Sequence, residues 1–172
     1  VYRRFPWYAT ASERRDLVPA NLPERPVAPV AAYTVGYEGK SVDEFFDALL
    51  RAGIQAVLDV RSNPVSRKYG FARKSMSEVA GNLGLDYHHL PELGITSTDR
   101  ADLSDFDSYQ RLLAKYETET LPKRSAAVAE LVELFHKRPS AVVCFEKDAR
   151  CCHRSRLAAA AGRAGDLEVV HL

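Results

Sequence analysis

Short apolar runs alternate with amphipathic segments from residue 32 to the end of the chain. The apolar runs have the length of β-strands and lie at 32–35, 56–60, 85–89, 141–145 and 168–171. The segments between them carry apolar residues at helical spacing and lie at 41–52, 75–84, 106–116, 122–135 and 152–161. This alternation predicts an α/β fold, namely a single three-layer, Rossmann-like domain over residues 32–172 with a mainly parallel sheet of about five strands.

Two of the predicted helices begin with the pattern of a capping box. Ser41 and Glu44 are spaced so that each side chain can bond the backbone amide of the other, and Ser75 and Glu78 repeat the spacing. Gly84 suits the end of the second of these helices. We therefore expect helices to begin at Ser41 and at Ser75.

Residues 1–31 differ from the rest of the chain. They contain five prolines and five arginines and show neither helical nor strand periodicity. This composition predicts an N-terminal arm over 1–31, separate from the domain at 32–172. Phe5, Trp7 and Tyr8 are the aromatic residues with which the arm could pack on the domain.

The composition indicates a soluble globular protein. Hydrophobic residues make up 46% and charged residues 27%, and the 24 basic residues nearly balance the 23 acidic ones. This balance argues against a generally basic nucleic-acid binder but not against a local basic site. The three cysteines lie within residues 144–152, which does not predict a disulfide scaffold. No apolar run is long enough to span a membrane, and we expect a cytoplasmic location.

Polar segments follow four of the predicted strands and hold most of the side chains capable of chemistry. They lie at 36–41, 59–64, 88–94 and 144–148, and 152–154 comes just beyond the last. In open α/β sheets the ligand crevice lies outside the carboxyl ends of the strands. The sequence therefore predicts a ligand site at that edge of the sheet.

The first polar segment is a candidate anion site. Its glycines permit unusual backbone dihedrals, Ser41 opens a helix whose first amides are free, and Lys40 adds a positive charge. Tyr37 is a further candidate ligand, and Glu38 a candidate supporting carboxylate. The alternative is a tight turn with an ordinary helix cap.

The second polar segment is a stronger candidate for binding an anion. Asp59 and Arg61 lie on one face at a strand end because residues two apart share a face. Asn63 begins a turn, and Arg67 leads a group of cations that could grip phosphate. A solvated basic loop is the alternative.

The sequence does not predict a metal site or a cofactor. His88 and His89 are adjacent in a strand and point to opposite faces, so they cannot readily bind one ion. Residues 151–153 lie too close together for the usual spacing of zinc ligands. Glu92, between a proline and a glycine, is instead a candidate fixed carboxylate.

The last polar segment contains two candidate reactive groups. Cys152 lies at an expected helix start beside His153 and Arg154, conditions that lower a thiol pKa. Cys144 lies in an apolar strand, so we expect it to be a small buried hydrophobic residue. Glu146 can act as acid, base or nucleophile if burial shifts its pKa, and we favour it over Cys152. The alternative for Cys152 is structural packing.

Five ordered motifs and the chain end carry a family resemblance. They lie at 33–41, 59–64, 89–94, 144–148, 152–154 and 171–172. Together they resemble the domain-of-unknown-function family numbered 488, and the resemblance covers about residues 32–172. It implies a compact α/β domain in a bacterial or archaeal intracellular protein, and the family's name assigns no reaction. Cys151 lies outside these motifs.

These features favour a small enzyme acting on an anionic substrate, such as a nucleotide, a nucleic-acid end or a phosphorylated metabolite. Arg61, Arg67 and Arg154 would bind the anion, and Glu146 would carry the chemistry. We expect the side chains of Glu38, Arg61, Glu92 and Glu146 to converge on one crevice.

Two other functions stay open. One is thiol chemistry such as sulfur transfer, with Cys152 as the nucleophile. The other is a non-catalytic module that binds nucleic acid or nucleotides through the basic loop and the aromatic arm. The substrate and the oligomeric state do not follow from the sequence.

Overall fold

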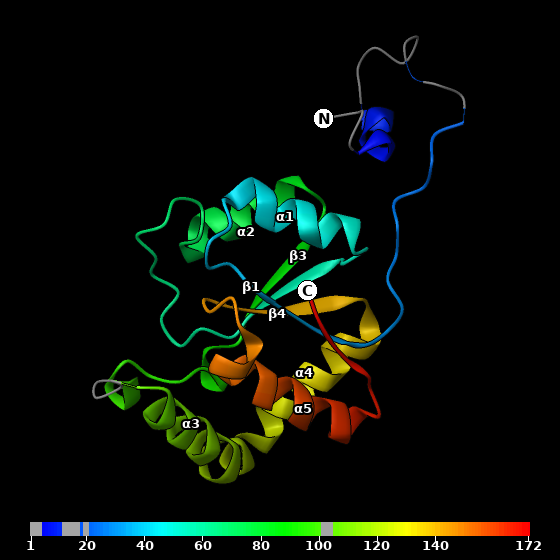
Figure 1. The fold of residues 1–172 in the computed structure, drawn as a ribbon. Coiled ribbons are helices and arrows are strands. Elements are labelled where there is room, and N and C mark those ends of the chain that lie inside the picture. Colours follow the sequence, from blue (N-terminus) through cyan, green and yellow to red (C-terminus); the bar gives the residue numbers. More distant parts are fainter. Residues whose placement is uncertain (1–4, 12–17, 19–20, 101–104) are drawn as a thin grey trace.

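The computed structural model describes residues 5–11, 18, 21–100 and 105–172 of the chain. At the centre of these residues lies one sheet of five parallel strands in the order β3-β2-β4-β1-β5 (Figure 1). The strands are β1 (Ala32–Gly36), β2 (Ala56–Asp59), β3 (Asp86–His89), β4 (Ser140–Cys144) and β5 (Val169–His171). Each strand lies where the sequence predicts one, with ends that differ by a residue or so.

Helices cover both faces of the sheet. Helices α1 (Val42–Arg51) and α2 (Arg73–Asn82) pack on one face, and α4 (Ser125–Lys137) and α5 (His153–Gly165) pack on the other (Figure 1). Helix α3 (Phe106–Lys115) continues into a π-helical turn at Tyr116–Thr120. This three-layer arrangement confirms the predicted fold class.

Short 3₁₀ turns complete the regular structure of the described residues. They are η1 (Pro6–Ala11), η3 (Pro91–Leu93), η4 (Thr98–Arg100), η6 (Leu121–Arg124) and η7 (Ala149–Cys151). Among the helices formed by the described residues, none has the length and apolar character needed to cross a membrane.

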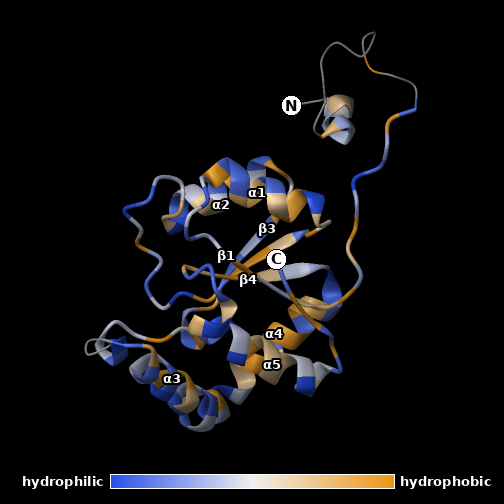
Figure 2. Ribbon diagram, in the orientation of Figure 1, coloured by the Kyte–Doolittle hydropathy of each residue, from blue (hydrophilic) through white to orange (hydrophobic). Residues whose placement is uncertain are grey.

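The sheet separates two hydrophobic cores. Along β4, Ala141 and Val143 pack towards α1 and α2, whereas Val142 packs towards α4 and α5. Because side chains alternate along a strand, Cys144 lies on the same side as Val142. Figure 2 shows hydrophobic residues, in orange, along the central strands and on the helices that pack against them.

The two predicted capping boxes have different outcomes. At the start of α1 the Ser41 amide donates to Glu44 Oε2 at 2.7 Å and the Glu44 amide donates to Ser41 Oγ at 3.2 Å, which confirms the first. The second prediction is wrong, because α2 begins at Arg73 and Ser75 lies inside the helix. Burial of Phe71 just before α2 fixes the chain there, so tertiary packing overrides the local cap signal.

The predicted helix start at Cys152 is confirmed to within one residue. Helix α5 begins at His153, and Cys152 is its N-cap residue with extended backbone angles. Cys152 therefore stands at the junction between η7 and α5, with its side chain buried.

Part of the N-terminal segment contacts the domain. The Tyr8 hydroxyl donates to the Leu83 carbonyl at 2.6 Å, and Phe5 packs against the core on the α1 and α2 side. The Arg25 guanidinium donates to the Leu83 and Ile54 carbonyls at 3.2 and 3.3 Å. The predicted boundary between an arm and a domain stays a prediction, because residues 1–4, 12–17 and 19–20 lie outside the described part.

The order of the strands fixes where a ligand can enter. Strands β1 and β4 are neighbours, but β1 leads into α1 on one face and β4 leads towards α5 on the other. Such a switch leaves a crevice outside the C-terminal ends of the two strands.

Candidate functional site

A crevice of about 540 Å³ opens at the C-terminal ends of β1, β2 and β4. Its lining includes Arg61, Asn63, Arg67, Lys68, Arg100 and Cys144. Sites for small molecules typically have volumes of about 300–1,000 Å³. The size and the position at the strand switch make this crevice the candidate ligand site.

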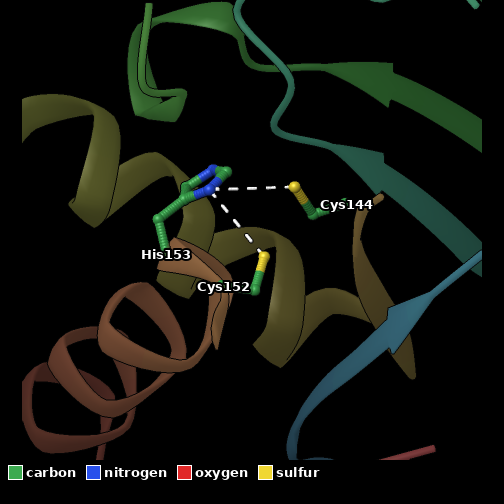
Figure 3. A group of neighbouring side chains, drawn as sticks. All are labelled: Cys144, Cys152 and His153. Carbon is green, nitrogen blue, oxygen red and sulfur yellow. Dashed lines mark hydrogen bonds between the residues drawn. The ribbon is translucent and has the colours of Figure 1, made fainter. Parts of the chain in front are cut away.

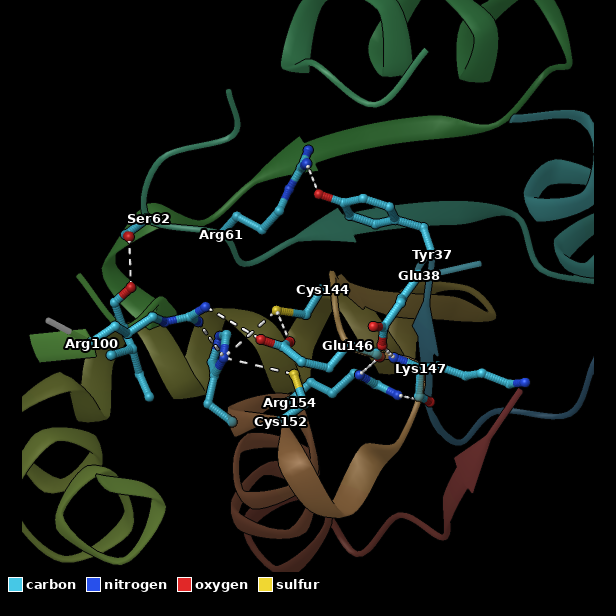
Figure 4. Close-up of polar contacts among 12 residues, drawn as sticks. Tyr37, Glu38, Arg61, Ser62, Arg100, Cys144, Glu146, Lys147, Cys152 and Arg154 are labelled. Carbon is cyan, nitrogen blue, oxygen red and sulfur yellow. Dashed lines mark hydrogen bonds and ion pairs between the residues drawn. The ribbon is translucent and has the colours of Figure 1, made fainter. Parts of the chain in front are cut away.

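The ends of β1 and β4 are tied together beside the crevice. A Cβ atom on Gly36 would lie 1.9 Å from the Glu146 carbonyl oxygen, so only glycine permits this approach. The Glu38 carboxylate accepts from the Lys147 amide at 2.8 Å (Figure 4). The Glu38 amide donates to the Phe145 carbonyl at 2.8 Å. Glu38 therefore holds the backbone of the loop that carries Glu146.

Arg61 is engaged in a buried network with Asp59. Its Nε and Nη2 atoms donate to the two carboxylate oxygens of Asp59 at 2.8 and 2.6 Å, and Asp59 is fully buried. Its Nη1 atom donates to the Tyr37 hydroxyl at 2.9 Å and to the Phe71 carbonyl at 2.8 Å. Tyr87 donates to Asp59 as well, and its pKa is raised by burial and by this hydrogen bond. The charge of Arg61 is thus neutralised within the fold, even though its side chain borders the crevice.

Other basic side chains that line the crevice are available to a ligand. Arg67 is exposed and forms no ion pair with any described residue. The Lys68 ammonium donates to the Tyr37 carbonyl at 3.0 Å. Arg100 reaches the crevice from η4, and its Nη1 atom lies 3.3 Å from Glu146 Oε1. Arg67, Lys68 and Arg100 give the crevice a positive wall, to which the exposed Asn63 adds an amide.

A buried cluster of Cys144, Cys152 and His153 lies beside this wall. His153 Nδ1 is 3.7 Å from the Cys144 sulfur and 3.9 Å from the Cys152 sulfur (Figure 3). The Cys144 thiol donates to Glu146 Oε2 at 3.2 Å. All three side chains of the cluster are about 1% exposed, yet Cys144 reaches the crevice lining.

The neighbours of these groups shift their pKa values in different directions. The Cys152 thiol donates to the Cys144 sulfur and lowers the pKa of Cys144, an effect to which His153 adds. Burial raises the pKa of Cys152, and the adjacent Cys144 raises it further. The expected lowering at Cys152 is therefore wrong, because Cys152 is buried behind Cys144 and its helix-start position does not offset that burial. Burial also raises the pKa of Glu146.

Other predicted anion ligands point away from the crevice. The buried guanidinium of Arg154 donates to the carbonyl oxygens of Glu146 and Lys147 and so holds the backbone of the loop after β4. The Lys40 ammonium donates to the Gly36 carbonyl at 2.9 Å, and the Ser41 side chain caps α1. These side chains support the strand ends rather than line the crevice.

The four side chains expected to converge on one crevice are only partly brought together. Arg61 lines it, and Glu146 reaches it through Cys144 and Arg100. Glu38 is used by the loop backbone. Glu92 is exposed and borders a separate hollow next to η3 and α3, so the expectation of a shared site is wrong for Glu92. Its strand, β3, lies at the edge of the sheet, two places away from β4.

Sequence reasoning missed two contributors to the site. Cys144 was expected to be an ordinary core residue, but it ends β4 at the crevice. Arg100 belongs to none of the motifs, and its only sequence signal is a charge in the polar stretch after β3. Its contacts with Glu146 and with His153 Nδ1 arise only from the folding of η4 over the strand ends.

Comparison with known protein families gives a match. The family model described as "Domain of unknown function DUF488" matches residues 41–161, which include most of the crevice and the cysteine cluster. No curated protein and no solved structure matches the chain significantly.

Proposed function

The chain belongs to the DUF488 family, whose name assigns no reaction, and we propose that it is a small enzyme that binds an anionic substrate in the crevice. The observation that carries this proposal is the wall of Arg67, Lys68 and Arg100 facing the buried Cys144 and Glu146. Guanidinium and ammonium groups bind phosphate and carboxylate strongly when they converge. The volume of about 540 Å³ suits a nucleotide or a phosphorylated metabolite.

Glu146 is the group best placed to move a proton in this reaction. It is mostly buried, and it contacts two residues that line the crevice, Arg100 at 3.3 Å and Cys144 at 3.2 Å. An anionic group of the substrate would compete with Glu146 for Arg100. Binding would thereby release the carboxylate next to the substrate, where it can act as acid or base in cleavage or transfer.

A binding experiment tests the anion site. The substitutions Arg67→Ala and Lys68→Ala together should weaken binding of pyrophosphate or nucleoside phosphates at least about tenfold, the scale of a lost charge-assisted contact. The pair Lys123→Ala and Arg124→Ala, exposed on η6, removes the same charge elsewhere and should leave the affinity unchanged. Titration calorimetry at two salt concentrations measures the affinities of both double variants, and an uncharged nucleoside serves as the negative control. Equal affinities for the two double variants would remove the crevice from consideration as the anion site.

A turnover experiment tests whether the protein is an enzyme. Chromogenic phosphate monoesters and diesters and a panel of nucleotides are incubated with the protein. Glu146→Gln should lose nearly all turnover because it keeps the shape and removes the titrating group. Asp148→Asn is the matched control, since Asp148 lies on the same loop and pairs with Arg150 outside the crevice. Anion binding without turnover of any substrate would favour the non-catalytic binding module.

Sulfur transfer is a second candidate, favoured by the position of Cys144 at the crevice lining. A Cys144 thiolate would attack the outer sulfur of an anionic donor such as thiosulfate, forming a persulfide on Cys144 and releasing sulfite with the bonding electron pair. Mass spectrometry after incubation with thiosulfate would show one added sulfur atom on Cys144. An unmodified Cys144 would exclude this function.

A further inference from the structure

The spacing of the cysteine cluster fits a metal site better than a set of hydrogen bonds. The ligand atoms of Cys144, Cys152 and His153 all lie within 4.8 Å of one another. The distances from His153 Nδ1 to the sulfurs, 3.7 and 3.9 Å, are long for hydrogen bonds. With zinc–sulfur and zinc–nitrogen bonds of about 2.3 and 2.0 Å, two ligands of a tetrahedral ion lie about 3.6 Å apart. A small contraction of the cluster would therefore enclose a metal ion (Figure 3).

The histidine presents the right atom to such an ion. Arg100 Nη2 lies 3.4 Å from His153 Nδ1, and a guanidinium can only donate, so Nδ1 is the acceptor and carries a lone pair. Both sulfurs lie around this same nitrogen. The other ring nitrogen, Nε2, has no hydrogen-bond partner among the described residues, and the ring packs against Tyr116. An unprotonated Nδ1 that faces two thiols can bind a metal once its single lone pair is released from the 3.4 Å contact with Arg100, which keeps its ion pair with Glu146.

The charges of the two thiolates and of the Arg100–Glu146 ion pair sum to zero with a divalent ion in place. Two thiolates and the Glu146 carboxylate carry three negative charges. A divalent cation and Arg100, which is paired with Glu146, carry three positive charges. A buried group of charges is tolerated when it is paired in this way. The thiol protons would pass to the solvent when the metal binds.

We propose that Cys144, Cys152 and His153 bind a zinc-class divalent ion through two thiolates and one imidazole nitrogen. Two sulfurs and one nitrogen favour zinc over magnesium or calcium, which prefer oxygen ligands. Three protein ligands leave a fourth position, as in catalytic zinc sites. Cys144 borders the crevice and Glu146 Oε2 lies 3.2 Å from its sulfur, so Glu146 would be near an ion held by these ligands. As a ligand, Cys152 would be required for function, although the sequence favoured Glu146 over it.

A metal at this site deepens the proposed function, and only its role in catalysis rests on that function. A zinc-bound water next to Glu146 would supply the nucleophile for cleaving an anionic substrate, with Glu146 taking its proton. Metal binding itself depends on the three ligands alone. It excludes the sulfur-transfer alternative, because a metal-bound Cys144 is not free to carry sulfur.

The test uses the full chain, purified without chelators or a histidine tag. Mass spectrometry of the metal content should find about one zinc per chain. After exchange, cobalt should give a thiolate-to-cobalt charge-transfer band and the intense visible bands of a tetrahedral ion. Cys152→Ser should lose most of the metal and both spectral features. Cys151→Ser is the matched control, because Cys151 is the neighbouring cysteine and lies outside the cluster, and it should keep both.

A second measurement covers the case in which Cys152→Ser does not fold. In the wild-type protein zinc should slow alkylation of Cys144 and Cys152 by iodoacetamide, while Cys151 reacts at the same rate with and without zinc. Equal alkylation rates of the cluster cysteines with and without zinc, or equal metal content in Cys152→Ser and Cys151→Ser, would overturn the inference. Zinc binding without any anion binding would instead refute the proposed function and leave the metal site standing.

Discussion

Replacing Arg61 by methionine should expose the cost of an unpaired charge at the end of β2. Asp59 is fully buried, and the guanidinium of Arg61 meets both of its carboxylate oxygens at 2.8 and 2.6 Å. Removing one partner of such a pair destabilises a protein by about 3–5 kcal/mol. Arg61→Met also removes the donor to the Phe71 carbonyl, which adds about 1 kcal/mol. We expect a loss of about 4–6 kcal/mol in the free energy of unfolding for Arg61→Met, and a loss of about 3–5 kcal/mol for Asp59→Leu.

A double-mutant cycle separates the pair from its surroundings. In Asp59→Leu with Arg61→Met no charge is left unpaired, so the double variant should be more stable than the sum of the single losses predicts by about 2 kcal/mol or more. Urea unfolding followed by far-ultraviolet circular dichroism measures each variant. Arg51→Met is the control, because Arg51 pairs with Asp47 on the exposed surface of α1 and should cost less than about 1 kcal/mol. A loss below about 1 kcal/mol for Arg61→Met, or strictly additive losses, would refute the reasoning.

Three further changes test other parts of the structure. Gly36→Ala would force a Cβ atom to within 1.9 Å of the Glu146 carbonyl, so it should cost about 1–3 kcal/mol or more in urea unfolding and abolish any turnover that Glu146 supports. Tyr116→Phe removes the 2.6 Å hydrogen bond to the Leu93 carbonyl and should cost about 1–2 kcal/mol, read as a lower thermal midpoint; no change would mean that water replaces the hydroxyl. His171 is an exposed residue, but partial desolvation and the nearby charge of Arg154 lower the pKa of its ring from 6.5, so the ring destabilises the fold as the pH falls through that range. The drop in thermal midpoint caused by His171→Gln should therefore be larger at about pH 8 than at about pH 5. The opposite order would mean that folding raises the pKa of His171 instead of lowering it.

The sequence predicted the fold well because each strand and helix had a local signal. Five apolar runs and their intervening helical patterns correspond to the five strands and the main helices. The capping box formed at Ser41, where α1 begins one residue later as the local signal predicts. At Ser75 the same signal failed, because the buried Phe71 stacks on Tyr37 at 4.3 Å and fixes where α2 begins. Local signals therefore held wherever tertiary packing did not oppose them.

The candidate site was less predictable because its parts meet only through the order of the strands. The sequence marked the strand ends as polar but could not show that β4 lies between β1 and β2. That order brings Cys144 next to Cys152 and His153, although the spacing of residues 151–153 alone argued against zinc. It also leaves Glu92 outside, because β3 is an edge strand. No rule of sequence spacing identifies a group of candidate ligands that come from the end of a strand and the start of a helix.

The alternation of side chains along the strands explains why the crevice has two chemically different walls. Tyr37 and Arg61 follow the side of the sheet that faces α1 and α2, where Asp59 neutralises Arg61. Cys144 lies on the other side, where α5 supplies Cys152. In the proposed function, a substrate in the crevice would lie between the loop that carries Arg67 and Lys68 and the buried cluster. Arg67 and Lys68 would hold its anionic part while its reacting bond lies at the cluster. A shift of β4 by one residue would turn the Cys144 side chain to the other face of the sheet and away from Cys152.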